Sequence, residues 1–372
     1  MYHKPKLTPV LILVVISLLI YGPGAQINAS AQEDVVQSKT VSPQEQDAAL
    51  SFWTREAIAE AEPMGLMVQK GPAEIEAESA LPKTGNDPVA FSPAGFAAAD
   101  AETVARTAYA EDWAMAFDAD TLQVDAPTGT SQVYTAYTVN QLSSLQTLYP
   151  HRWVGRLSFQ TPSGTSYCSA TSISGNVMLT AAHCLYDTTN NRWYSNWVFS
   201  PAYRNGSTPF GTFPATRCWI LTSWVNLSGS FSINSWTRHD VGVCEMGTNS
   251  AGQTLNAAVG FMGRQWNYGY VRHFHDMGYP FRDYNLNLLP SAGSYLRTCV
   301  SESFQQTTDT LGTGCSYGPG ISGGPWTINY AIGAISGYAN SVNSGLFVGT
   351  QNIYGPRFNS SNIVPLCSAA GC

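Results

Sequence analysis

The chain has 372 residues and a formal net charge of −7, and this charge is divided unevenly along the sequence. Residues 1–150 contain 18 acidic against seven basic side chains, whereas residues 151–372 contain seven acidic side chains against 11 arginines. The 11 arginines are scattered and form no basic run, which argues against a nucleic acid as partner. The two parts therefore carry net charges of about −11 and +4 and could attract each other.

The first 31 residues have the pattern of a secretory signal peptide. A short basic lead precedes an almost wholly apolar run over residues 7–21, and small residues at positions 29–31 suit a cleavage site. The alternative is an uncleaved membrane anchor, but the run is short for a span of about 20 residues and contains Pro9. No other stretch of the sequence is long and apolar enough to cross a bilayer. The sequence predicts a secreted protein without stable membrane association after signal removal.

Residues 32–150 form an acidic segment without cysteine, rich in Ala, Glu and Gln. Residues 44–61 and 98–117 have helical composition, and in the second stretch an aromatic residue recurs at every fourth position. Five prolines between the two stretches indicate loose folding there. The segment resembles a partly helical propeptide that assists folding or silences the domain after it, with a processing site between residues 120 and 153.

From residue 151 the sequence changes to short alternating apolar runs separated by Gly, Asn, Ser and Pro, a pattern that predicts strands. We expect strands at residues 154–159, 169–181, 213–225, 240–246, 271–279, 326–336 and 345–351. Few helical periods occur among these roughly 220 residues, which suits an all-β barrel or a pair of sandwiches. Residues 151–372 are therefore predicted to form one all-β domain.

All eight cysteines lie in this second part, as expected for disulfide bonds in an exported domain. Their spacing favours sequential pairing, although eight cysteines allow 105 connectivities and the sequence selects none of them. The sequential pairs are Cys168–Cys184, Cys218–Cys244, Cys299–Cys315 and Cys367–Cys372. A zinc site is the alternative, but no pair has the C-x-x-C spacing that is usual for structural zinc.

Three motifs place a histidine, an aspartate and a serine in that order. His183 lies in Thr-Ala-Ala-His-Cys, Asp240 begins an alternating apolar run, and Ser322 lies in Gly-Ile-Ser-Gly-Gly-Pro. A serine hydroxyl needs a base to take its proton and amides to hold the oxyanion. The glycines allow a turn that directs the amides of Gly320 and Ser322 inward. The order of base, orienting carboxylate and nucleophile predicts a Ser-His-Asp hydrolase.

Two other interpretations of the serine motif are a glycine-rich turn with an incidental serine and the nucleophile elbow of α/β-hydrolases. The α/β-hydrolase fold places its histidine after the serine, whereas no histidine follows Ser322. This order argues against a lipase or esterase. For the orienting carboxylate, the other acidic residues of the domain compete with Asp240. The main competitors are Asp187, Asp276, Asp283 and Asp309.

The remaining histidines of the domain give weaker indications. We expect His239 to be a loop residue. His273 and His275 would face the same side of a strand with Asp276 nearby, but two ligands at i and i+2 are weak evidence for a metal. No metal and no cofactor is therefore expected.

The part from residue 151 to residue 372 resembles the chymotrypsin-like (trypsin-fold) serine endopeptidases, through the three motifs around His183, Asp240 and Ser322. The resemblance implies two packed antiparallel β-barrels, His183 as general base, Asp240 as orienting carboxylate and Ser322 as nucleophile. It also implies an oxyanion hole made by the amides of Gly320 and Ser322, and a bridge from the cysteine after His183 to one on the preceding strand.

The function so implied is a secreted serine endopeptidase that is made as a zymogen and works as a monomer. Its partners would be polypeptide substrates and its own propeptide. The alternative is a catalytically silent homologue that binds a partner through the same fold.

Ile321 departs from the best-known members of that family, which have an aspartate there that pairs with the new amino terminus after activation. The departure shifts the resemblance toward the bacterial glutamyl-endopeptidase-like branch, which also lacks this aspartate. The counterpart of that branch's glutamate-selecting histidine is expected at Ser336.

The specificity pocket is predicted from the same resemblance. Its wall is expected at Ser336, Gly337 and Tyr338, and its floor near Ser316 and Tyr317. No acidic residue lies at this floor, which disfavours selection of Lys or Arg.

Overall fold

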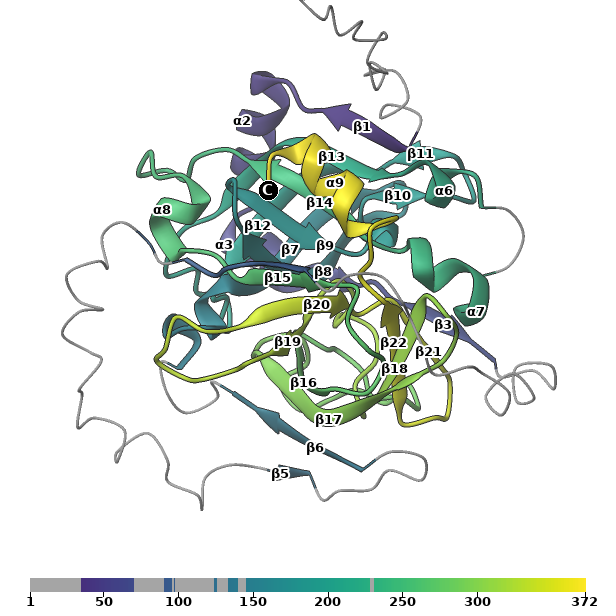
Figure 1. Cartoon of the computed structure of the whole chain (residues 1–372). Coiled ribbons are helices and arrows are strands. Elements are labelled where there is room, and N and C mark those ends of the chain that lie inside the picture. Colours follow the sequence, from purple (N-terminus) through teal and green to yellow (C-terminus); the bar gives the residue numbers. More distant parts are fainter. Residues whose placement is uncertain are drawn as a thin grey trace, which may run out of the picture.

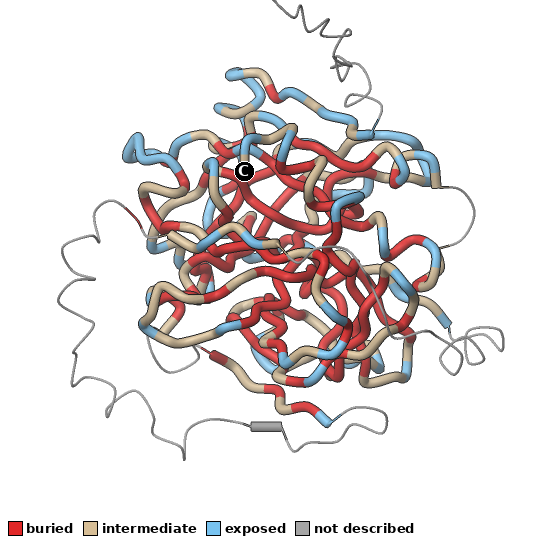
Figure 2. Tube along the Cα trace, in the orientation of Figure 1, coloured by how far each residue is buried: buried red, intermediate tan, exposed pale blue. Residues whose placement is uncertain are grey.

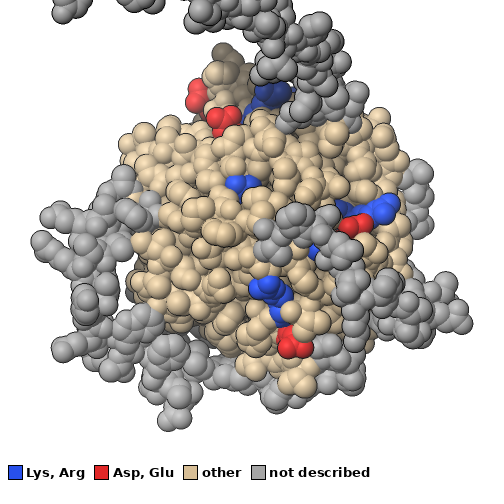
Figure 3. Space-filling model, in the orientation of Figure 1, with Lys and Arg blue, Asp and Glu red and all other residues tan. Residues whose placement is uncertain are grey.

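The computed structural model describes residues 35–69, 90–95, 97, 124–125, 133–139, 145–227 and 231–372. The predicted signal peptide and the helix predicted at residues 98–117 lie outside these residues. Buried positions fill the interior of both the upper and the lower half of the fold (Figure 2). Few charged side chains are visible on the face shown in Figure 3.

The first half of the domain is a closed antiparallel barrel (Figure 1). Its strands are β7 (Val154–Thr161), β8 (Gly164–Ile173), β9 (Val177–Thr180), β12 (Ser195–Pro201), β13 (Phe213–Leu221) and β14 (Gly242–Met246). The barrel closes because β12 pairs with β7 while β14 pairs with both β9 and β13. Leu157, Phe199 and Val243 are fully buried inside it. Burial of such side chains stabilises the fold by about 1.5–3 kcal/mol each.

The second half is a larger, mostly antiparallel sheet system below the barrel (Figure 1). Its strands are β15 (Gly263–Trp266), β16 (His273–Gly278), β17 (Arg297–Gln305), β18 (Thr310–Gly314), β19 (Pro325–Ile328), β20 (Tyr338–Val342), β21 (Gly345–Phe347) and β22 (Asn352–Pro356). Phe274, Leu311, Ile321 and Trp326 belong to its apolar core. The prediction of an all-β domain is confirmed.

Short elements connect these strands and cover the ends of the barrel. They are β10 (Tyr186–Asp187), β11 (Arg192–Trp193), η3 (Leu145–Thr147), η4 (His151–Trp153), η5 (Ala182–Cys184), η6 (Thr237–His239), α6 (Thr222–Val225), α7 (Ile233–Trp236), α8 (Leu255–Val259) and α9 (Ile363–Ala370). Among the residues described, no helix combines the length and the apolar character needed to span a membrane.

Four disulfides cross-link the domain, so the prediction of disulfide bonding is confirmed. The bonds join Cys168 to Cys184, Cys218 to Cys244, Cys299 to Cys315 and Cys367 to Cys372. Each bond links sequential cysteines. The first ties η5 to β8, and the second joins the directly paired residues of β13 and β14.

The helix predicted over residues 44–61 is interrupted in the structure. It forms α2 (Pro43–Phe52) and α3 (Arg55–Glu60), with Trp53 and Thr54 between them. Trp53 is 4% exposed, and its indole N–H donates to the carbonyl oxygen of Asn196. Thr54 then caps α3 by accepting a hydrogen bond from the amide of Ala57. Packing of Trp53 on the barrel therefore replaces one long helix by two short ones.

Strands from the first 150 residues join the sheets of both halves. They are β1 (Val36–Thr40) beside β13, β2 (Glu62–Pro63) beside β8, β3 (Leu66–Val68) beside β21, β4 (Ala90–Ser92) beside β15, β5 (Val124–Asp125) beside β6, and β6 (Tyr134–Thr138) beside β17. The described part of residues 32–150 thus pairs with the domain after it and forms no separate sheet of its own.

β6 is expected to be an integral part of the second half, because Ala136 is fully buried and pairs with Cys299. Ala136→Asp would bury an unpaired carboxylate and lower the free energy of unfolding by about 3 kcal/mol or more. Thr135→Asp is the matched control, since Thr135 lies on the other face of the strand and is only partly buried. Urea unfolding measures both, and equal stability of the two variants would contradict the prediction.

Candidate active site

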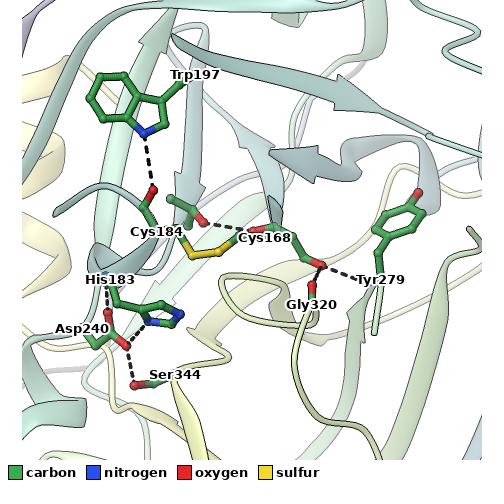
Figure 4. Close-up of a disulfide and its surroundings, with 10 residues drawn as sticks. Cys168, His183, Cys184, Trp197, Asp240, Tyr279, Gly320 and Ser344 are labelled. Carbon is green, nitrogen blue, oxygen red and sulfur yellow. Dashed lines mark hydrogen bonds and ion pairs between the residues drawn. A yellow bond between two sulfur atoms is a disulfide. The ribbon is translucent and has the colours of Figure 1, made fainter. Parts of the chain in front are cut away.

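His183 lies in the first barrel, at the start of the connection between β9 and β10. His183 lies in the single turn η5, directly after β9, and is 4% exposed. The next residue, Cys184, is bonded to Cys168 on β8, and its carbonyl accepts a hydrogen bond from the indole of Trp197 (Figure 4). The disulfide and this hydrogen bond hold the turn that carries the imidazole.

Asp240 is fully buried, and its carboxylate accepts three hydrogen bonds (Figure 4). Oδ1 accepts from the backbone amide of His183 at 2.9 Å, and Oδ2 accepts from Nδ1 of His183 at 2.7 Å. The hydroxyl of Ser344 donates to the same Oδ2 at 2.5 Å. A buried carboxylate needs such compensation, because transferring an unpaired charge out of water costs several kcal/mol. With the Nδ1 proton directed at Asp240, Nε2 of His183 carries the free lone pair.

Ser322 lies in a tight turn that only small residues permit. Gly323 has a φ of +79°, and a Cβ there would lie 2.1 Å from Oγ1 of Thr180 and 2.9 Å from the amide nitrogen of Ala181. The carbonyl of Ser322 accepts from the amide of Ser169 at 2.7 Å. The turn is therefore packed against the chain just before His183.

The backbone of Asn343 connects the serine turn to Ser344, the residue that donates a hydrogen bond to Asp240. Its carbonyl accepts from the amide of Gly323 at 2.8 Å, and its amide donates to the carbonyl of Gly324 at 2.9 Å. Ser344, the next residue, is the hydroxyl donor to Asp240. The structure thus brings the His183, Asp240 and Ser322 motifs together.

No hydrogen bond joins Nε2 of His183 to Ser322 in this conformation. Nε2 of His183 is buried and has no hydrogen-bond partner within the described part of the chain. Such bonds are often long in sites without substrate and tighten in the reacting complex. Ser322 itself is 4% exposed.

Gly320 presents its amide to an acceptor outside the serine turn. This N–H donates to the carbonyl oxygen of Met64 at 2.8 Å, while the carbonyl of Gly320 accepts from the hydroxyl of Ser169 at 2.9 Å. The single proton of this amide is therefore engaged by Met64 in this structure.

The sequence did not predict a set of buried polar side chains that are joined by hydrogen bonds next to the serine turn. The side chain of Asn343 accepts from the indole of Trp326 at 2.7 Å and donates to Oδ1 of Asp276 at 2.5 Å. Asp276 is fully buried, and burial raises its pKa well above 3.8. The sequence contains no indication of these hydrogen bonds, because Asp276 and Trp326 lie 67 and 17 residues away from Asn343.

The residues predicted to form the pocket wall lie at the start of β20 and directly before it. Ser336 donates to the carbonyl of Asn329, and Tyr338 begins β20, where its ring packs edge-on against Phe91. A different segment, the one that contains Ser344, lies beside Asp240. Of the predicted floor residues, Tyr317 belongs to the apolar core of the second half, and the carbonyl of Ser316 accepts from the amide of Tyr284.

His239 and His275 have partners other than the Asp240 carboxylate. His239 contacts Ser223 and Arg238, and burial lowers its pKa to about 4. His275 stacks on the ring of Tyr330 at 3.9 Å, and its pKa is also lowered to about 4 by burial.

One group of potential metal ligands occurs among the described residues, and it consists of Cys168, His183 and Cys184. The two cysteines are bonded to each other, so neither offers a thiolate to a metal. Ile321 is 2% exposed within the apolar core of the second half. An apolar side chain there offers no partner to a newly formed amino terminus.

No known family model matches the chain. Over 117 residues it is 28% identical to the glutamyl endopeptidase of Bacillus licheniformis, an alignment that covers 32% of this chain and 32% of that protein. Over 114 residues it is 27% identical to a protein of Bacillus subtilis named extracellular metalloprotease, covering 30% of this chain and 34% of that protein. The match thus spans about a third of the length of each relative.

A solved structure of a Glu endopeptidase in complex with MPD is similar in fold. The superposition has a TM-score of 0.50 at 16% identity and covers 64% of this chain and 97% of the other. At this identity, the likeness establishes the fold alone.

Asp276 is expected to make the protein less stable as the pH rises. Its raised pKa means that the folded chain keeps a proton that the unfolded chain releases above about pH 4, so stability falls from that pH up to the raised pKa. Asp276→Asn removes this titration. Relative to the unchanged protein, the variant should gain up to about 1.4 kcal/mol per pH unit in this range. Urea unfolding at several pH values measures the difference, and parallel curves would contradict the assignment.

Proposed function

We propose, from the chymotrypsin-like fold and the partial match to a glutamyl endopeptidase, that this chain is a secreted serine endopeptidase made as a zymogen. The observation that supports this most directly is the pair of hydrogen bonds from His183 to Asp240, beside the turn that carries Ser322. A base that is oriented by a carboxylate next to a serine is the arrangement required for acyl transfer.

In the proposed mechanism, Nε2 of His183 takes the proton of Ser322 as its oxygen attacks the substrate carbonyl. Asp240 keeps the Nδ1 proton in place and stabilises the imidazolium that forms, at the 2.7 Å seen here. The imidazolium then gives its proton to the leaving amine, and an acyl-enzyme remains on Ser322. Water releases the acid by the reverse sequence, with His183 again as the base.

The developing oxyanion would be held by the amides of Gly320 and Ser322. The Gly320 amide already donates to a carbonyl oxygen, that of Met64, so its direction suits this role. Removing one such donor from a hydrolase costs about 3–4 kcal/mol of transition-state stabilisation.

A metal-dependent mechanism is the second candidate, because one relative is named a metalloprotease. The only cluster of suitable side chains among the described residues has its two sulfurs in a disulfide. A serine mechanism is therefore better supported. A catalytically silent homologue is the third candidate, and the complete set of serine, histidine and aspartate argues against it.

Residues 1–31 would be removed as a signal peptide, and the following segment would act as a propeptide. We place the processing site before Val133, since β6 pairs with β17 over five residues and buries Tyr134. The processed enzyme would then retain β6 together with residues 151–372.

A fluorophosphonate probe should label Ser322 in the processed protein. Ser322→Ala should abolish labelling and lower kcat for peptide hydrolysis by about 10⁴-fold or more, because the nucleophile is lost. Mass spectrometry locates the label, and Ser294→Ala, at a surface turn, serves as control. A folded, processed protein that takes up no label would disprove the proposed activity.

Ser344 should contribute to catalysis through Asp240. Ser344→Ala removes one charge-assisted hydrogen bond, so we expect kcat to fall about tenfold with little change in KM. Ser341→Ala is the matched control, because this buried serine on β20 donates to the carbonyl of Pro356 and does not contact Asp240. Equal kcat values for the two variants would rule out the positioning role.

A further inference from the structure

Residues 62–69 cross the serine turn from one half of the domain to the other. Glu62 and Pro63 pair in parallel with Ser166 and Tyr167 of β8. The amide of Met64 then donates to the carbonyl of Tyr167 at 2.9 Å. This end of the segment therefore extends the edge of the first barrel, one residue before Cys168.

The middle of the segment lies on the serine turn itself. The carbonyl of Met64 accepts from the amide of Gly320, the proposed oxyanion donor, at 2.8 Å. Gly65 lies so close to Pro319 that a Cβ on this glycine would be 3.0 Å from its Cα. A carbonyl of the segment thus takes the place that the proposed mechanism gives to the substrate.

The other end of the segment pairs with β21, immediately after Ser344. Leu66, Met67 and Val68 pair in parallel with residues 345–347, and the amide of Val348 donates to the carbonyl of Val68 at 2.9 Å. A Cβ at Gly345 would lie 3.0 Å from the carbonyl oxygen of Leu66. A glycine at this position therefore lets the two backbones approach.

Side chains of the segment alternate between contact and solvent. Val68 packs against a cluster that contains Ile233, Phe347 and Tyr354. Leu66 packs against the main core, whereas Met67 between them is 41% exposed. The segment is held through two apolar side chains and its backbone.

We propose that residues 62–69 form an autoinhibitory strand in the polypeptide-binding groove of this site, a step that rests on the proposed protease function. The strand contacts Pro319 and Gly320, directly before the turn of Ser322, and Ser322 is 4% exposed. It occupies the amide of Gly320 and the edges of β8 and β21 at once. A substrate would need all three.

The direction of the strand explains how it can resist cleavage. It runs parallel to both β8 and β21, whereas antiparallel pairing is the more stable arrangement for an added strand. A substrate that pairs antiparallel would run the opposite way, and its leaving amine would lie toward β8, where the Cys168–Cys184 bridge adjoins His183. If the carbonyl of Met64 were attacked, the leaving amine would be that of Gly65. In the bound segment this amide lies on the β21 side, away from that position.

The groove so defined accepts an extended polypeptide mainly through its backbone. Alternate apolar residues, as at Leu66 and Val68, fit the β21 side. We expect the substrates to be extended polypeptides with apolar residues at alternate positions, bound in the direction opposite to that of the segment.

The first test follows labelling of Ser322 by a fluorescent fluorophosphonate on a gel that separates the full-length chain from the processed chain. The full-length band should react at least about tenfold more slowly than the processed band. Leu66→Asp and Val68→Asp, which place a charge in apolar contacts, should raise the full-length rate about tenfold or more. Met67→Asp, on the exposed face of the same strand, should leave it unchanged.

Labelling of the processed band distinguishes failure of the proposed protease function from failure of the proposed autoinhibitory strand. If the processed band of the unchanged protein takes no label, the protease function itself fails. If it is labelled and the full-length band reacts equally fast, the autoinhibitory strand is disproved while the function stands. Normal labelling of the processed Val68→Asp band shows that the variant folded, since processing removes the segment.

A second test uses a synthetic peptide of residues 60–69 with the processed enzyme, so that folding of the leader variants does not matter. The peptide should inhibit hydrolysis competitively and stay intact by mass spectrometry. The peptide with Val68→Asp should bind at least about tenfold more weakly, and the one with Met67→Asp equally well. Cleavage between Met64 and Gly65 would show a substrate-like direction, and absence of inhibition would show that the groove does not bind this strand; either result overturns the proposal.

Discussion

The carboxylate of Asp240 is the interaction on which the candidate site depends. It is fully buried, and it is satisfied only when donors from two distant segments, η5 and the start of β21, reach it together. Because an uncompensated buried charge would cost several kcal/mol, the fold is stable only in the arrangement that also orients the imidazole. Stability and catalytic geometry therefore share the same hydrogen bonds.

Two connections link this arrangement to Ser322, the proposed nucleophile. The Cys168–Cys184 disulfide fixes the turn of His183 to β8, and the backbone of Asn343 fixes the serine turn next to Ser344. The side chain of Asn343 also donates to Asp276, a buried acid of the second half whose pKa is raised by burial. The proposed catalytic groups thus lie where the two halves meet, and each half contributes residues that the other holds in place.

The leading segment uses the same surfaces that substrate binding would need. Its strands pair with both halves, and the part between β2 and β3 lies over the serine turn. Such pairing relies on backbone groups, which are complementary to any extended chain. One segment can therefore extend the sheets of the fold and also bind in the proposed polypeptide-binding groove. The opposite net charges of the two parts of the chain add a general attraction, but the contacts of the segment 62–69 described above are backbone pairs and apolar side chains.

The sequence by itself determined the all-β class, the disulfide bonding and the order of the three motifs, because alternation, cysteine count and short local patterns are properties of neighbouring residues. The roles of His183, Asp240 and Ser322 stay predictions, as does secretion. Only the tertiary structure decided that Ser344 lies beside Asp240. It also revealed β12, β17, β18 and β22, which the alternating apolar pattern did not predict. Ser344 and Asp240 are 104 residues apart, and no local pattern encodes such a contact.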